Sequence, residues 1–329
     1  LDDSVPTAAL TTPRPVVGAS PLPGGTSMVV SRSDGEVDVV DLASMAVVRT
    51  LDHAAPGVPA VSADGRLVAV VANEPRPEVR VREIATGRLV SSTHDVGVRS
   101  DPQGTGTVPA RVYSVAFSPD GSRLALAASG SVRVVDATTG RTLAVQDLAA
   151  DLNVADLDVA KDGLLPRRTV AWTPDGRLVA VTSSTGARLW DPVSQKVVQW
   201  FEGHSGTAQG LALDPAGRRL VTTSVDKTAR VYDVGTGALV AVLRGHTGEV
   251  LTAAFSPSGE RVVTSGLDGT VRVWAVDGTL LATYPVATVV ASSARFLGAE
   301  DRLLVTTEEG ANFTQDPVPA VQAGAAVRQ

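Results

Sequence analysis

The chain has 329 residues, of which 43% are hydrophobic and 19% charged, and it contains no cysteine. The absence of cysteine excludes disulfide scaffolds, thiolate metal sites and thiol catalysis, and a formal net charge of −6 gives no electrostatic footprint for a nucleic-acid backbone. No apolar run reaches the roughly 18 residues that a membrane-spanning helix needs. We therefore expect neither nucleic acid nor a membrane as a partner. Because residue 1 is Leu, we expect the chain to be part of a longer protein, and we predict a cytoplasmic location.

A turn signal followed by a short apolar run recurs along the chain. The seven copies lie at residues 23–31, 62–70, 118–127, 173–181, 214–223, 256–265 and 298–307. Most intervals between copies are close to about 40 residues, and two intervals are longer. The sixth copy shows four short runs, Val250–Ser256, Arg261–Thr264, Thr270–Ala275 and Thr279–Tyr284, separated by SPSG, GLDG and VDG turns. Such punctuation is typical of antiparallel hairpins, so each unit predicts one four-stranded blade of a β-propeller.

The predicted fold is all-β: a seven-bladed β-propeller of four-stranded antiparallel blades in a closed ring. The propeller is placed at residues 15–316, preceded by residues 1–14 and followed by a C-terminal tail, residues 317–329. The predicted blades lie at about residues 15–51, 57–96, 111–148, 168–202, 207–244, 249–285 and 286–316.

Several motifs resemble those of WD-repeat β-propellers: Gly203-His204, Gly245-His246, Trp190-Asp191 and the turns SVDKTARVYD and GLDGTVRVW. The resemblance implies that each blade is braced by hydrogen bonds among a His, a Ser or Thr, an Asp and a Trp. The matching residues are His246, Thr264, Asp268 and Trp274 in copy six, and His204, Thr222, Asp226 and Tyr232 in copy five. Buried polar groups need such partners, so we interpret these His–Asp pairs as scaffolding and not as catalytic groups.

The resemblance also bears on both ends of the chain. The last copy supplies only three runs, and in WD-repeat propellers an N-terminal strand, here roughly Val5–Thr11, completes the last blade and removes a free sheet edge. Residues 1–10 alternatively resemble the helical junction that precedes the WD-repeat region in actinobacterial STAND-type multidomain signalling ATPases. Residues 1–14 are therefore either a closing strand or a linker.

Copies two to four depart from the bracing pattern, because they lack the complete His, Thr and Asp set. We expect these blades to depend on packing of Val, Leu and Ala between blades. The chain also lacks a Gly-x-Ser-x-Gly elbow, a P-loop, a His-Glu-x-x-His motif and a dinucleotide fingerprint. The Asp-rich stretch at 148–168 does not have the ligand spacing of an EF-hand. We therefore predict no enzymatic activity, no cofactor and no metal site.

Three length variations fall in one sector of the ring: the insertions 97–110 and 148–168 and the expanded turn Asn73–Glu78. Long loops in a compact repeat fold are usually functional or disordered. The predicted partner-binding residues are Arg76, Arg99, Asp101, Arg111, Asp156, Asp158, Arg167 and Arg168. We predict a monomeric, non-catalytic scaffold or sensor module of a larger bacterial signalling protein that presents top-face loops to a protein or peptide. The alternative is a propeller that binds a small molecule, or acts as an enzyme, through its central channel.

Overall fold

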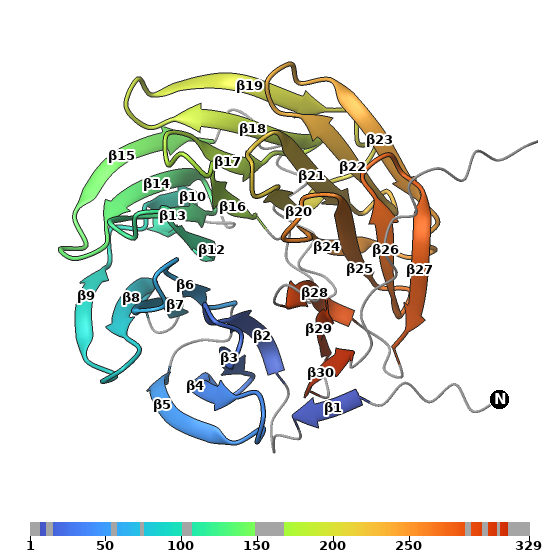
Figure 1. Cartoon of the computed structure of the whole chain (residues 1–329). Helices are drawn as coiled ribbons and strands as arrows, with labels where there is room; N and C mark the ends of the chain where they lie inside the picture. Colours follow the sequence, from blue (N-terminus) through green and yellow to red (C-terminus); the bar gives the residue numbers. More distant parts are fainter. Residues whose placement is uncertain are drawn as a thin grey trace, which may run out of the picture.

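Strands arranged around a central channel form the body of the protein in the computed structural model (Figure 1). The structure describes residues 7–10, 16–53, 58–72, 76–100, 107–148, 168–286, 291–297, 302–307 and 310–314. Among these residues, no helix is both long and apolar enough to cross a membrane.

The first half of the chain forms three four-stranded antiparallel sheets. Blade one consists of β2 (Val16–Pro21), β3 (Ser27–Arg32), β4 (Glu36–Asp41) and β5 (Val47–His53). Blade two consists of β6 (Ala60–Val61), β7 (Leu67–Ala72), β8 (Glu78–Glu83) and β9 (Leu89–Thr93). Blade three consists of β12 (Val112–Phe117), β13 (Arg123–Ala128), β14 (Ser131–Asp136) and β15 (Thr142–Asp147).

The second half repeats this pattern. Blade four consists of β16 (Val170–Trp172), β17 (Val179–Thr182), β18 (Gly186–Asp191) and β19 (Lys196–Glu202). Blade five consists of β20 (Ala208–Leu213), β21 (Arg219–Ser224), β22 (Thr228–Asp233) and β23 (Leu239–Arg244). Blade six consists of β24 (Val250–Phe255), β25 (Arg261–Gly266), β26 (Thr270–Ala275) and β27 (Leu280–Pro285).

The blade count requires a correction. The prediction counts seven blades, whereas the structure has six blades built from four consecutive strands. The remaining four-stranded sheet is a composite of both ends of the chain. It contains β28 (Ala291–Leu297), β29 (Arg302–Thr307) and β30 (Gly310–Thr314), and its outer strand is β1 (Thr7–Leu10), which pairs antiparallel with β30. The last repeat has only three strand-forming runs, so it cannot make a blade from its own residues.

The sheets follow one another around the channel with their first strands innermost (Figure 1). The composite sheet contacts blade one through β2 and blade six through β24. Because strands within a blade alternate in direction, all inner strands begin at the same end of the ring. We call this end the top face. It also carries the turns between the second and third strands of each blade, while the turns between the third and fourth strands lie at the opposite end.

Apolar side chains that point toward neighbouring blades form the core. One cluster joins Val221 and Leu243 of blade five to Val250, Phe255 and Trp274 of blade six, and all five are buried. This arrangement follows from the sequence pattern, because alternating apolar residues in a half-buried strand place one row of side chains against each adjacent sheet. Each blade is thus stabilised by its two neighbours rather than by a core of its own.

Arginines at the start of the second strands connect neighbouring blades. The Arg123 guanidinium lies 4.6 Å from the centre of the Trp172 ring in the next blade and donates a hydrogen bond to the Gly176 carbonyl at 2.8 Å. Arg219 donates in the same way to the carbonyl of Gly259 at 3.2 Å. Cation–π contact and a charged donor combine in this arrangement, which fixes the spacing of the blades at the bottom of the ring.

The insertion at residues 97–110 contains a β-hairpin that was not predicted from the sequence. Strands β10 (Val98–Ser100) and β11 (Thr107–Pro109) pair antiparallel in the connection from blade two to blade three. The Ala110 N–H donates to the carbonyl of Gly97 at 2.9 Å and closes the base of this hairpin. Ala110 is also buried, so the hairpin is attached firmly to the ring.

Candidate functional site

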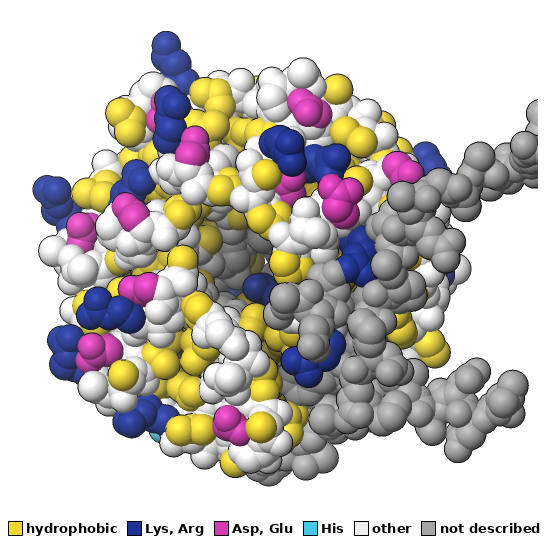
Figure 2. Space-filling view, viewed as in Figure 1, with side chains coloured by type: hydrophobic (Ala, Val, Ile, Leu, Met, Phe, Trp, Pro, Cys, Tyr) yellow, Lys and Arg dark blue, Asp and Glu magenta, His cyan; other side chains and the backbone are white. Residues whose placement is uncertain are grey.

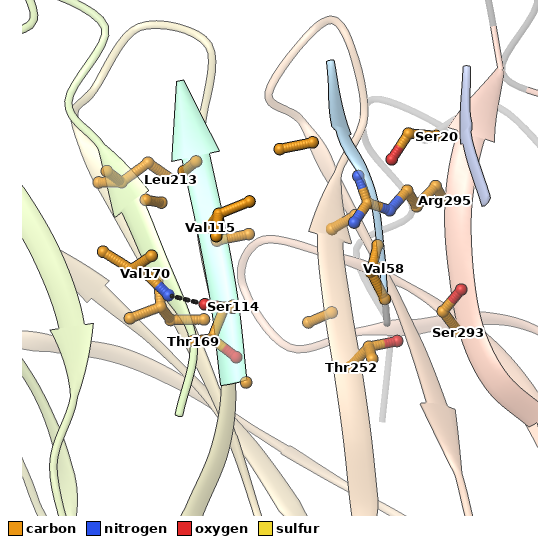
Figure 3. A pocket seen from close by; sticks show the side chains of 18 of the residues that line it. Ser20, Val58, Ser114, Val115, Thr169, Val170, Leu213, Thr252, Ser293 and Arg295 are labelled. Atoms are coloured by element: carbon orange, nitrogen blue, oxygen red, sulfur yellow. Dashed lines mark hydrogen bonds between the residues drawn. The ribbon is translucent and has the colours of Figure 1, made fainter. Parts of the chain in front are cut away.

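The central channel is a hollow with a volume of about 860 Å³. In Figure 2 it opens at the middle of the ring among hydrophobic side chains, and charged side chains of both signs are spread over the surrounding face. Residues from all the inner strands line it. Its hydroxyl groups connect neighbouring blades: Ser114 Oγ accepts a hydrogen bond from the Val170 N–H at 3.0 Å (Figure 3), and Thr169 Oγ1 donates to the Gln209 carbonyl at 3.1 Å.

Only four charged residues line the channel among the described residues: Arg111, Arg168, Asp214 and Arg295. Arg111 and Arg168 lie just before β12 and β16, at the top face. Asp214 is buried in the turn after β20, where its carboxylate accepts hydrogen bonds from the N–H groups of Arg218 and Arg219 at 2.7 and 3.0 Å. The channel lining is therefore positively charged, although the chain as a whole carries a net charge of −6.

The structure brings together some of the predicted partner-binding residues. Arg111 and Arg168 share the channel lining, and Arg76 is exposed in the turn between β7 and β8 on the same top face. Arg99 lies on β10, paired with Val108. The predicted residues Asp101, Asp156, Asp158 and Arg167 lie outside the described residues.

Sequence reasoning missed Arg295, which extends from β28 into the channel (Figure 3). The available signal was a comparison of equivalent positions in the inner strands. That comparison requires the correct register in each copy, and short apolar runs of Val and Leu leave the register uncertain by one residue.

The bracing residues of blade six form a continuous chain of hydrogen bonds. His246 Nδ1 lies 2.9 Å from Asp268 Oδ2, and His246 Nε2 lies 2.8 Å from Thr264 Oγ1. Trp274 Nε1 donates to the same Thr264 oxygen at 2.9 Å. Asp268 also accepts the N–H group of Thr247 at 2.9 Å. These hydrogen bonds therefore join four segments: the loop that leads from blade five into blade six, the second strand of blade six, the turn after it, and the third strand.

The direction of these hydrogen bonds defines the protonation of His246. An indole N–H can only donate, so Thr264 Oγ1 accepts from Trp274, and its own hydrogen points to His246 Nε2. The ring is then neutral, with its proton on Nδ1 facing Asp268. Burial lowers the pKa of His246, even though the Asp268 carboxylate acts in the opposite direction. Burial alone would raise the pKa of Asp268, but hydrogen bonds from Thr247 and Thr270 and the adjacent His246 lower it on balance.

Blade five has the same His–Asp–Thr connection with a different aromatic residue. His204 Nδ1 lies 2.8 Å from Asp226 Oδ2, and His204 Nε2 lies 2.8 Å from Thr222 Oγ1. Tyr232 is buried beside them, but its hydroxyl donates to the backbone carbonyl of Glu202 at 3.0 Å. Tyr232 therefore bonds to the outer strand of blade four, whereas Trp274 of blade six bonds to the Thr of its own blade.

Family models provide an independent comparison. The model described as "WD domain, G-beta repeat" matches residues 101–136, 195–233 and 237–275. The last two segments each include the outer strand of one blade and the first three strands of the next, so each repeat links two adjacent blades. The protein is a WD-repeat β-propeller. No curated protein matches the chain significantly. WD-repeat propellers generally act as scaffolds that bind protein partners, and they are typically not enzymes.

Blades one and two of this WD-repeat propeller use ion pairs in place of the His–Asp connection. The nearly buried Asp52 on β5 of blade one pairs with two residues on β8 of blade two, Arg80 at 3.1 Å and Arg82 at 2.7 Å. In blade one, the buried Asp38 pairs with Arg32 and accepts a hydrogen bond from Thr50 at 2.7 Å. Blade two, which we expect to depend on packing of Val, Leu and Ala, is therefore also joined to blade one by buried ion pairs.

Blade four retains the Trp of the family pattern without its acceptor. Trp190 is fully buried, and its Nε1 has no hydrogen-bond partner in the described part of the chain. Trp190 lies opposite Val179 as Trp274 lies opposite Val262, so Val181 occupies the position of Thr264. A methyl group stands where the family places a hydroxyl, which leaves a buried donor unsatisfied.

Substitution of Val181 by Thr should therefore cost less stability than the same change elsewhere in the core. A buried hydroxyl without a partner costs about 1–3 kcal/mol, but at position 181 the new oxygen can accept from Trp190. Val263→Thr is the matched control, because Val263 is equally buried. The measurement is urea unfolding of both variants, and a cost for V181T equal to or above that for V263T would contradict the assignment of the orphaned donor.

No cluster of three or more His, Asp or Glu side chains suited to hold a metal ion occurs among the described residues. The polar connections of blades five and six are embedded in the sheets, with the His204 and His246 side chains buried. The side chains that line the channel include arginines, hydroxyl groups and many apolar residues.

Proposed function

We propose that this WD-repeat propeller is a non-catalytic scaffold, a module of a larger signalling protein, and that it binds a protein or peptide partner at the top face around the channel mouth. The observation that carries the proposal is the placement of both Arg111 and Arg168 in the lining of one channel, just before β12 and β16 of neighbouring blades. Arginine forks direct orientation and choice of partner.

The rest of the top face supports this assignment. On one side of the ring, the loops before β20 and β24 are short, and the His–Asp hydrogen bonds hold them in place. On the other side, the connection to blade three carries the hairpin of β10 and β11. A rigid half and an elaborated half on one face suit a surface that presents loops to a partner, since recognition residues concentrate on loops held by a rigid framework.

The test is capture of a partner from the source organism, followed by titration of the purified partner against two double variants. Arg111→Ala with Arg168→Ala removes two charges from the channel mouth. Arg88→Ala with Arg141→Ala is the matched control, since it removes two charges from exposed turns at the opposite end of the ring. We expect the first pair to weaken binding by about tenfold or more, with little change for the control. Equal affinities for the two double variants would refute the proposed face.

A further inference from the structure

One position on the inner strands differs sharply between the sheets. In each inner strand it comes one residue before the residue that pairs with a buried residue near the start of the second strand, which is Met28, Val68, Leu124, Val179, Leu220, Val262 or Leu303. Around the ring the residues at this position are Ser20, Ala60, Ala116, Ala171, Ala212, Ala254 and Arg295. All seven line the channel. Six small side chains therefore surround a single large cation.

The guanidinium of Arg295 is available for a ligand. No hydrogen bond or ion pair joins it to another side chain in the part of the chain that the structure describes, and it is open to the water of the channel. The protein around it strips away part of its hydration and lowers its pKa. A guanidinium remains charged in proteins even so, and a partly desolvated charge gains more from an anionic partner than an exposed one.

The nearby hydroxyl groups are already engaged in bonds between strands and blades. Ser20 Oγ donates to the Pro59 carbonyl at 2.6 Å, and the Ser293 and Thr252 hydroxyls pair with Thr306 and Ser265 at 2.7 Å. These groups fix the walls of the channel. Arg295 therefore supplies the donors that can turn toward a ligand, and its planar fork matches the two oxygens of a carboxylate.

Distance along the channel indicates the shape of the ligand. Arg111 and Arg168 precede the residues equivalent to Arg295 in their own strands by five and three positions. A strand rises about 3.3 Å per residue, so Arg295 lies roughly 10–17 Å below the arginines of the channel mouth. An extended peptide has the same rise, and acidic side chains three to five residues apart would reach both levels.

We propose that Arg295 is the anchor of a carboxylate-binding site inside the channel, and that an extended acidic segment of the partner carries the carboxylate. This inference rests on the proposed function, since it specifies the chemistry of the partner segment that enters at the top face. The Ala and Ser residues at this position leave the space beside Arg295 free of other large side chains, and the positive lining selects for acidic side chains over basic ones.

The experiment is calorimetric titration of the protein with an end-blocked hexaglutamate peptide, an end-blocked hexaglutamine peptide and free glutarate. Arg295→Ala is the test variant, and it introduces the residue that blades two to six already have at this position, so the fold should tolerate it. Arg141→Ala is the control for the loss of one charge. We expect hexaglutamate to bind and R295A to weaken it about tenfold or more, with R141A unchanged, R295K intermediate and hexaglutamine not bound.

Each other outcome has a definite meaning. Equal affinities of R295A and R141A for hexaglutamate would overturn the site, since general electrostatic attraction would then explain the binding. Arg295-dependent binding of glutarate without binding of hexaglutamate would overturn the peptide source of the carboxylate. Normal partner binding by R295A together with loss of binding by the Arg111 and Arg168 double variant would refute this inference while leaving the proposed function intact.

Discussion

Replacing Trp274 with Ala should lower the free energy of unfolding by about 3–5 kcal/mol, the usual cost of removing a large aromatic side chain from a packed core. Trp274 is 1% exposed and packs between blades five and six, against Phe255 of its own blade and Leu243 of its neighbour. It also donates the hydrogen bond that ends the polar chain at Thr264. Its loss therefore removes apolar contacts and leaves a cavity at a blade interface.

Two further variants separate these contributions. Trp274→Phe keeps a ring in the core but removes the donor, and we expect a smaller loss than for the Ala variant. Trp200→Ala is the control, because Trp200 is 43% exposed and its ring contacts Arg188 at the outer edge of blade four. An exposed cation–π contact is worth about 0.5–1 kcal/mol. Urea unfolding provides the values, and equal losses for W274A and W200A would contradict the central place of Trp274.

Removal of the Asp268 carboxylate should cost about 1–3 kcal/mol, the penalty for leaving buried polar groups unsatisfied. In Asp268→Ala, the proton on His246 Nδ1 and the N–H groups of Thr247 and Thr270 lose their acceptor together. The Nδ1 of the neutral His246 ring would then keep only its longer contact with Thr270 Oγ1, at 3.3 Å. The loop that enters blade six should loosen as a result.

Asp277→Ala is the matched control in the same blade. Asp277 is exposed and accepts the N–H of Thr279 in a turn at 2.9 Å, and substitutions at such surface positions usually stay within about 0.5 kcal/mol. Melting temperatures of the two variants give the comparison. Equal shifts for D268A and D277A would show that the His–Asp connection does not brace the blade.

The sequence was informative where chemistry and spacing coincide. Asp-Gly turns between short runs predict antiparallel hairpins, and a spacing of 22 residues from His246 to Asp268 fits the hydrogen bond between them. The same turn chemistry recurs in the bottom turns, where Ser118 Oγ donates to Asp120 at 2.5 Å and Gly121 adopts a positive φ of 70°. Local geometry of this kind depends on few residues, so it can be predicted directly from the sequence.

Register and long-range placement could not be read in the same way. Leu67 and Leu178 are each followed by a valine, and it is the valines, Val68 and Val179, that are fully buried. A shift of one residue moves a side chain to the other face of a strand, and adjacent apolar residues satisfy either choice. The same uncertainty of register hid Arg295 on β28. At the ends of the chain, the resemblance left residues 1–14 as either a closing strand or a linker, and only the pairing of β1 with β30 places Thr7–Leu10 in the composite sheet.

Ion pairs of blades one and two were also beyond prediction. Asp52 is 28 and 30 residues from Arg80 and Arg82, and only the packing of β5 beside β8 brings these groups within 3.1 Å. No short motif marks such pairs. Charged residues on strands are usually solvated, so the sequence favours exposed side chains at these positions, and only the fold brings them together.

The most direct test of the proposed binding face is hydrogen–deuterium exchange of the protein with and without its purified partner. Inner strands pair on one edge only, so the N–H groups on their free edge face the channel and exchange with its water. We predict that the partner slows exchange in peptides covering β12, β16 and β28 and leaves the outer strands β15, β19 and β23 unchanged. Slower exchange confined to those outer strands, where Leu143, Val198 and Leu239 are exposed, would contradict it.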